Sequence, residues 1–167
     1  MLALDRWALQ RAEALHQKVT AAYESYDFHQ IYQGIHNFCI VELGGFYLDV
    51  LKDRLYTTPA HGLARLSAQT AMYHIAEALV RWLAPILCFT AEEIWAALPG
   101  ERPASVMLGQ WHQMPHVEAG ANDPDWPRIL EVREAVAKEL ERLRENGVIG
   151  SALEADVTLY CDGALRD

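Results

Sequence analysis

Residues 73–87 read YHIAEALVRWLAPIL and lead directly into CFTAEEIW at residues 88–95. Apolar side chains recur there at spacings of three and four, which is the period of one helix face. A second stripe lies on another face of the same helix, and this predicts a helix enclosed by neighbours in a bundle. The first stripe consists of Met72, Ile75, Leu79, Trp82 and Ile86, and the second of Leu66, Thr70 and Tyr73.

Pro85 lies near the end of this apolar stretch. Proline lacks a backbone donor and crowds the preceding turn, so we predict that the helix breaks there. Thr90 is followed three residues later by Glu93, which matches a capping box and predicts that a new helix begins at Thr90.

The composition is that of a folded protein: 51% of the 167 residues are apolar and 22% are charged. Three widely separated cysteines, Cys39, Cys88 and Cys161, show neither disulfide nor metal-ligand spacing. They are typical of reduced thiols, so we expect a cytoplasmic protein. The apolar stretch at residues 76–89 is broken by charges and a proline, which argues against a membrane span.

The net charge of −9 argues against a nucleic-acid partner when taken alone. The charge is uneven, however, because residues 28–82 carry four basic and four acidic side chains. Residues 117–167 carry twelve acidic and six basic ones, a net charge of −6. A local patch in the first of these regions could therefore still bind nucleic acid.

Two further helices are predicted before the one that opened this section. The first covers residues 4–26, with Tyr26 closing its inner stripe, and Asp27 is the predicted N-cap of a long second helix that reaches Tyr56. Gly44-Gly45 interrupts the second helix, where each glycine costs about 1 kcal/mol relative to alanine. We expect the helix to bend there or to be crossed closely by another.

The last third predicts a loop over residues 101–125, a helix over residues 126–145 capped by Asp123 or Asp125, and a short strand over residues 157–160. The fold class is therefore all-α, a bundle of four to five helices with a short strand-forming extension. The expected organisation is a bundle over 1–115, a loop over 116–125, a helix over 126–147 and the start of a truncated α/β segment over 148–167.

No catalytic or metal site is predicted. The chain contains no glycine-rich phosphate loop and no nucleophile elbow. Glu13-x-x-His16 matches one element of a di-iron bundle, but that site needs a second copy, so we interpret His16 as a surface residue. His74 is expected to be satisfied by a neighbour.

Several blocks along the chain resemble the C-terminal region of isoleucyl-tRNA synthetases. The matching blocks, in order, are LDRWA at 4–8, YESYDFH at 23–29, FYLD at 46–49, KDRLY at 52–56, the opening stretch at 73–87, and GSALEA leading into VTLY at 150–160. The resemblance covers nearly the whole chain. Valyl, leucyl and methionyl enzymes share related helices, and a valyl-type synthetase remains an alternative.

The resemblance implies the helical-bundle anticodon-binding domain of a class I synthetase, whose partners are the anticodon arm of tRNA(Ile) and the other domains of the parent enzyme. The family joins isoleucine to tRNA with ATP and magnesium, and it carries a C-terminal zinc. The chain lacks the HIGH and KMSKS motifs, so we expect no aminoacylation by this chain alone and no cofactor within it.

The predicted tRNA contacts are Lys52, Arg54 and Tyr56 at the end of the second helix, with Arg65 after the next loop. Cations bind phosphates and aromatic rings stack on unpaired bases. Alternatively, Arg54 pairs with Asp49 or Asp53 and Tyr56 closes the core.

Weaker candidates on the last helix are Arg128, Arg133 and Lys138, where interleaved glutamates favour a solvated face. Four tryptophans are interpreted as core or loop anchors: Trp7, Trp95, Trp111 and Trp126. The competing function is a structural or protein-interaction bundle whose acidic surface repels RNA.

Overall fold

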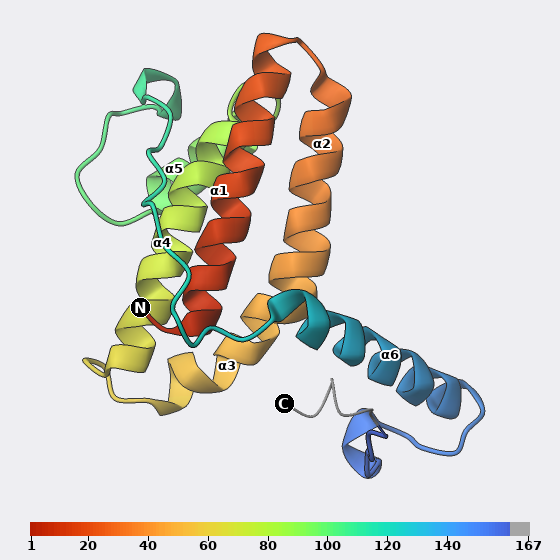
Figure 1. The fold of residues 1–167 in the computed structure, drawn as a ribbon. Helices are drawn as coiled ribbons and strands as arrows, with labels where there is room; N and C mark the ends of the chain where they lie inside the picture. The colour runs from red at the N-terminus through yellow and green to blue at the C-terminus, as the bar shows by residue number, and fades with distance from the viewer. Residues whose placement is uncertain (161–167) are drawn as a thin grey trace. The chain divides into compact units, whose positions relative to one another are not determined.

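The computed structural model describes residues 1–160, and Cys161 together with the rest of the chain lies outside them. The described structure divides into two units, Met1–Asp123 and a second that begins at Pro124. The first unit contains α1 (Ala3–Glu24), α2 (Phe28–Asn37), a π-helix (Phe38–Tyr47), α3 (Leu48–Thr57), α4 (Leu63–Leu83), α5 (Cys88–Ala97) and a 3₁₀ turn (Val106–Leu108). Figure 1 shows α1 packed between α2 and α4, as an all-α bundle requires.

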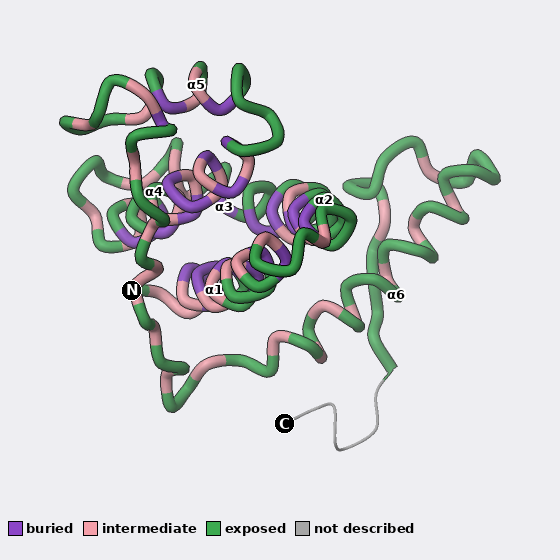
Figure 2. Tube along the Cα trace, turned by 90° about the horizontal axis from the view of Figure 1, so that it is seen from above, coloured by how far each residue is buried: buried purple, intermediate pink, exposed green. Residues whose placement is uncertain are grey.

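The core lies where α1, α2 and α4 face one another (Figure 2). The predicted inner stripe of α1 is buried from Ala8 to Ala22. Polar contacts join α1 to α4, because the Tyr23 hydroxyl donates to the Trp82 carbonyl at 2.6 Å and Trp82 Nε1 donates to His16 Nδ1 at 3.0 Å. His16 is therefore half-buried against a core tryptophan, and its interpretation as a surface residue was wrong.

The α1–α2 junction differs from the predicted stripe at Tyr26. Tyr26 is 78% exposed and has a φ of 58°, in the left-handed region. The amide of Asp27 bonds the Ala22 carbonyl at 2.8 Å and that of Tyr26 bonds the Tyr23 carbonyl at 3.2 Å, which is a Schellman cap. Tyr26 thus ends α1 instead of extending its buried face. Asp27 caps α2 through the Gln30 amide, as predicted.

The predicted long second helix is continuous in the chain but changes its winding. Residues Phe38–Tyr47 form a π-helix between α2 and α3. A Cβ added to Gly44 would lie 3.0 Å from the carbonyl oxygen of Cys39, five residues earlier in the same helix, and one on Gly45 would lie 3.2 Å from that of Ile40. The two glycines are therefore explained by the wide turn itself, and not by another helix that crosses there.

The helix break at Pro85 is confirmed, but the restart lies earlier than predicted. The Leu87 amide still bonds the Leu83 carbonyl and the Ala91 amide bonds the Leu87 carbonyl, so α5 already begins at Cys88. No side chain caps it, and Thr90 is an exposed residue within its first turn. The capping box at Thr90 and Glu93 was therefore a wrong prediction.

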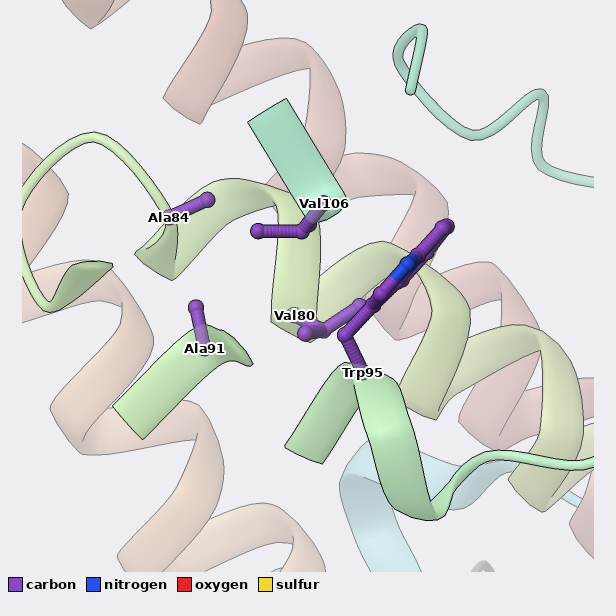
Figure 3. Close-up of a cluster of buried hydrophobic side chains, with 5 residues drawn as sticks. All are labelled: Val80, Ala84, Ala91, Trp95 and Val106. Atoms are coloured by element: carbon purple, nitrogen blue, oxygen red, sulfur yellow. The ribbon is translucent and has the colours of Figure 1, made fainter. Parts of the chain in front are cut away.

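The helix α5 packs on the end of α4 around Trp95 (Figure 3). The buried cluster comprises Val80, Ala84, Ala91, Trp95 and Val106. The guanidinium groups of Arg81 and Arg102 lie 4.7 Å and 4.5 Å from the Trp95 ring centroid, and both guanidiniums bind the carboxylate of Glu77. Trp95 is an anchor of the core, as expected.

The loop after α5 belongs to the first unit as far as Asp123. Gln10 on α1 donates to the Val117 carbonyl at 3.1 Å, and Arg6 Nε donates to Asp123 Oδ2 at 3.0 Å. These bonds attach residues 117 and 123, within the loop predicted over residues 116–125, to α1.

The second unit contains α6 (Trp126–Glu145) and a 3₁₀ turn (Ala152–Glu154). Asp125 caps α6 through the Arg128 amide, and Gly147 follows its end with a φ of 68°. No residue of α6 is buried. Within residues 1–160 there is no strand, so the predicted strand at 157–160 is absent from the described structure because no second strand pairs with it.

Candidate nucleic-acid interface

The end of α3 carries the three candidates of the KDRLY block, Lys52, Arg54 and Tyr56. Lys52 and Tyr56 are four residues apart and share one helix face, whereas Arg54 lies two residues from each and turns to the other side. The side chain of Lys52 is 67% exposed and Tyr56 is 84% exposed, whereas the Arg54 side chain is only 20% exposed. The three residues are therefore neighbours in sequence but not one surface.

Arg54 points into a buried polar cluster centred on Asp5 of α1. Its Nη1 donates to both oxygens of Asp5, at 2.9 Å and 3.1 Å. The hydroxyls of Tyr47 and Ser67 donate to the same carboxylate at 2.9 Å and 2.5 Å. This cluster joins α1, the π-helix, α3 and α4, so it fixes the end of α3 on the bundle.

The partner of Arg54 differs from the alternative raised by the sequence, in which Asp49 or Asp53 would take that place. Asp49 instead accepts from Lys52 Nζ at 2.9 Å, and this hydrogen bond raises the pKa of Lys52. Burial, followed by the charge of Asp5, raises the pKa of the Tyr47 phenol, which therefore stays protonated as a donor. Tyr56 is exposed, so it does not close the core.

Arg65 lies in the first turn of α4, and Tyr56 lies in the last turn of α3, before the short loop that joins the two helices. Gly62 is the N-cap of α4 and provides no side-chain cap, so no capping side chain satisfies the first amides of α4. Within residues 1–160 no ion pair of Arg65 is found, in contrast to Lys52 and Arg54. Of the candidates in the first unit that carry a positive charge, Arg65 is therefore the one without an ion pair among residues 1–160.

The weaker candidates lie on α6, in the second unit. The backbone of Arg128 is the amide that Asp125 caps, and Lys138 is exposed. Arg133 is also exposed. Other arginines of this helix pair with glutamates three residues earlier, as Arg142 does with Glu139 at 2.9 Å. The face is thus solvated and of mixed charge.

His74 is satisfied by a neighbouring side chain, as predicted. His74 Nδ1 lies 3.0 Å from His112 Nε2, so each ring satisfies the other. Among the described residues, no group of three or more histidine, cysteine, aspartate or glutamate side chains lies where it could hold a metal ion. No helix of residues 1–160 has the length and apolar content needed to cross a membrane, and the cytoplasmic location stays a prediction.

Sequence comparison agrees with this architecture. A family model described as the anticodon-binding domain of tRNA ligase matches residues 5–159. The isoleucine–tRNA ligase of Halorhodospira halophila is 58% identical over 169 residues, which cover 100% of this chain and 18% of that protein. Those of Thioalkalivibrio sulfidiphilus and Nitrosococcus oceani are also 58% identical, over 100% and 99% of this chain and 18% of their own length.

The chain thus spans about a fifth of the length of the curated relatives that it matches. The match to the family model extends from α1 through the second unit and includes the helix ends described above. This chain belongs to the family of anticodon-binding domains of tRNA ligases.

Proposed function

We propose that this chain is the tRNA-binding module of an isoleucine–tRNA ligase. In this role it binds the anticodon arm of tRNA(Ile) and positions the tRNA for ATP-dependent aminoacylation by a catalytic domain outside this chain. Identity of 58% over the full chain supports isoleucine–tRNA ligase over a valyl-type enzyme. ATP, magnesium and a zinc ion would bind elsewhere in the longer protein.

The observation that carries the proposal is the shared exposed face of Lys52 and Tyr56 at the end of α3, with Arg65 in the first turn of the next helix, α4. Tyr56 offers a stacking surface for a base of the anticodon loop, which RNA-binding proteins use in this way. Lys52 and Arg65 would contact phosphates, and the uncapped amides at the start of α4 would offer further donors to a phosphate.

Arg54 has a different part in this proposal. Because its guanidinium is held by the buried carboxylate of Asp5, it orients the end of α3 and does not itself meet phosphate. The exposed ion pair between Lys52 and Asp49 opens more easily, since such pairs contribute about 0–1 kcal/mol. RNA binding would therefore draw Lys52 away from Asp49 at little cost.

The α6 candidates Arg128, Arg133 and Lys138 are secondary contacts in this proposal. Their neighbours on the helix are acidic, and the described pairs on α6 join arginines to glutamates. They would add phosphate contacts to the tRNA stem only where a cation is released from its glutamate.

The proposal is tested by titrating the 167-residue chain with tRNA(Ile) at several salt concentrations. We expect saturable binding that weakens with salt, because phosphate contacts release counterions. Tyr56→Ala should cost about 1–3 kcal/mol of binding free energy, which is the contribution of one base–aromatic stack. Lys52→Ala should lower the slope of log K against log salt by about 0.7–0.9.

Lys18→Ala is the matched control, because Lys18 is an exposed lysine on α1 away from the end of α3. The competing function is a structural bundle without RNA contact. It is favoured by the net charge of −9 and by the ion pairs that Lys52 forms with Asp49 and Arg54 with Asp5. Equal tRNA affinity for wild type, Lys52→Ala, Tyr56→Ala and Lys18→Ala would exclude this interface, and no binding at any salt concentration would support the bundle.

A further inference from the structure

A cleft of about 610 Å³ lies within the first unit, away from the end of α3. Its walls come from the middle of α1, the C-terminal end of α4 and residues 106–113 of the loop after α5. The side chains that matter for its chemistry are His16, Trp111, His112 and Arg81. None of them belongs to the candidate tRNA contacts discussed above.

His16 lines this cleft, and its contact with Trp82 fixes which ring nitrogen carries the proton. Its Nδ1 accepts from Nε1 of the fully buried Trp82 at 3.0 Å, and the two rings stack with centroids 5.9 Å apart. An indole N–H can only donate, so Nδ1 must be unprotonated, and the neutral imidazole carries its proton on Nε2. Burial lowers the pKa of His16, which favours this neutral form.

Trp111 presents an aromatic surface to the same cleft. It is 41% exposed, and its ring contacts Tyr23 and His16 at centroid distances of 5.5 Å and 6.1 Å. The loop is held on both sides of this ring, because Arg81 Nε donates to the Gln110 carbonyl at 2.7 Å and His112 bonds His74. Because these bonds hold the loop while the Trp111 ring stays partly exposed, the ring is accessible from the cleft.

The charges around the cleft are internally compensated. Arg81 is paired with Glu77, and the other oxygen of Glu77 binds Arg102. Burial lowers the pKa of His74 and of His112, as it does for His16, so the three rings are neutral near pH 7. The cleft therefore offers an aromatic surface and neutral hydrogen-bonding groups, which suit an uncharged planar ring better than a phosphate.

We propose that this cleft binds one unstacked nucleobase of single-stranded RNA, with Trp111 stacking on the base and His16 Nε2 donating to an acceptor on its edge. The amide side chains of Gln110 and Gln113, both exposed at the rim, can bond the remaining edge groups. The inference rests on the proposed function, since a tRNA supplies unpaired bases in its loops.

The first test uses oligo(A) and oligo(U) trinucleotides, which have no stem, and follows the tryptophan fluorescence of the 167-residue chain. Subtracting the signal of Trp111→Phe isolates Trp111 from the other four tryptophans. We expect saturable quenching of the Trp111 signal. Isothermal titration calorimetry, which does not use Trp111 as its reporter, should show that Trp111→Ala binds about tenfold more weakly, as loss of one base stack produces. Phe89→Ala, which removes an exposed ring on α5 outside the cleft, should leave the affinity unchanged.

The second test separates a binding role of His16 from a structural one. His16→Gln keeps an acceptor for Trp82 and a donor into the cleft, whereas His16→Leu keeps neither. We expect His16→Gln to retain trinucleotide binding and His16→Leu to lose it, at temperatures where both variants show the wild-type near-UV circular dichroism. Equal affinities for the two variants, or unchanged affinity in Trp111→Ala, would overturn the proposal.

The outcomes also distinguish this cleft from the end of α3. Trinucleotide binding without tRNA binding would overturn the proposed anticodon-arm function and leave the cleft standing. Binding of tRNA that depends on Tyr56 but not on Trp111, with no trinucleotide binding, would overturn the cleft alone. Absence of quenching by any RNA would overturn it as well, and would fit a cleft that a protein segment covers.

Discussion

Asp5 has no exposed surface, yet it carries the charge on which the end of α3 depends. Its carboxylate is bonded by Tyr47, Arg54 and Ser67, and the Ser67 hydroxyl in turn accepts from the Leu2 amide at 2.8 Å. A buried carboxylate is tolerated only when its oxygens are paired and hydrogen-bonded in this way. Asp5 thereby positions the end of α3, which lies about fifty residues further along the chain.

We expect Asp5→Ala to lower the free energy of unfolding by about 3–5 kcal/mol, because it leaves a largely buried guanidinium and two hydroxyls without their acceptor. Urea denaturation followed by circular dichroism measures the change. Asp49→Ala is the control, since its exposed pair with Lys52 contributes about 0–1 kcal/mol. Similar losses for both variants would mean that the cluster contributes no more than a surface pair.

Glu77 is the second residue whose charge is enclosed, with 4% of its side chain exposed. Burial by itself would raise its pKa, but the hydrogen bonds from Arg81 and Arg102 outweigh burial and hold the pKa below the ordinary 4.5. The unfolded chain therefore binds this proton at a higher pH than the folded one. The stabilisation from Glu77 is complete above about pH 4.5 and is lost as the pH falls through the folded-state pKa.

We therefore expect Glu77→Gln to reduce stability at pH 7 by about 3 kcal/mol and to flatten the loss of stability between pH 5 and pH 3. Urea midpoints measured across this range for wild type and variant provide the test. A constant difference between the two proteins at all pH values would show that Glu77 titrates alike in both states.

At the scale of elements, a π-helix joins α2 and α3 within one continuous helical stretch. In a π-helix the amide of residue i bonds the carbonyl of residue i−5, whereas in an α-helix it bonds the carbonyl of residue i−4. Gly44 and Gly45 accept this arrangement because they carry no Cβ. The π-helix leads directly into α3, which carries Lys52 and Tyr56.

Gly44→Ala should consequently fail to give the stabilisation that alanine provides at an ordinary exposed helix position. The added Cβ would meet the Cys39 carbonyl at 3.0 Å, which offsets the gain of about 1 kcal/mol from helix propensity. The reverse change Ala14→Gly, on the exposed face of α1, measures that propensity in the same protein. A gain of 1 kcal/mol or more in Gly44→Ala, measured by thermal denaturation, would contradict this account of the π-helix.

At the scale of the whole molecule, burial is concentrated in the first unit. Every buried residue of the described chain precedes Asp123, whereas α6 buries none (Figure 2). The apolar stripe of α6 instead lines a groove of about 720 Å³ together with residues 155–160 of its own unit. The first unit therefore has a buried apolar core to stabilise it, whereas α6 in the second unit has none.

We expect a chain shortened after Asp123 to unfold cooperatively, at a temperature close to that of the 167-residue chain. Residues 124–160 alone should show partial helix content without a cooperative transition, since packing supplies most helix stability in proteins. Far-UV and near-UV circular dichroism during heating test both fragments. Loss of the cooperative transition in the shortened chain would show that the first unit needs the second.

Much of the architecture was predictable because helix periodicity and capping are local in the chain. The start of α1, both bounds of α6, the caps at Asp27 and Asp125 and the break at Pro85 all follow from residues within one or two turns. The two failures at helix ends, Tyr26 and Thr90, arose where competing backbone hydrogen bonds decided the turn. Neither set of bonds has a residue-type signature as strong as a glycine or a side-chain cap.

The candidate interface was predictable only in part. The KDRLY block locates the end of α3, and the helix period could have separated Lys52 and Tyr56 from Arg54. The cleft at His16 and Trp111 gave no signal, because its residues come from positions nearly one hundred apart and match no motif. A search restricted to local patterns cannot find such a site.

The sequence by itself determined the all-α class, most helix bounds and the family, since each depends on local periodicity or on ordered blocks of residues. Only the tertiary structure decided that Arg54 serves Asp5, that His16 serves Trp82, and that the long second helix winds as a π-helix at its centre. The two pairings join residues 49 and 66 positions apart. Their energies arise from desolvation and packing in the folded bundle, which no short stretch of sequence contains.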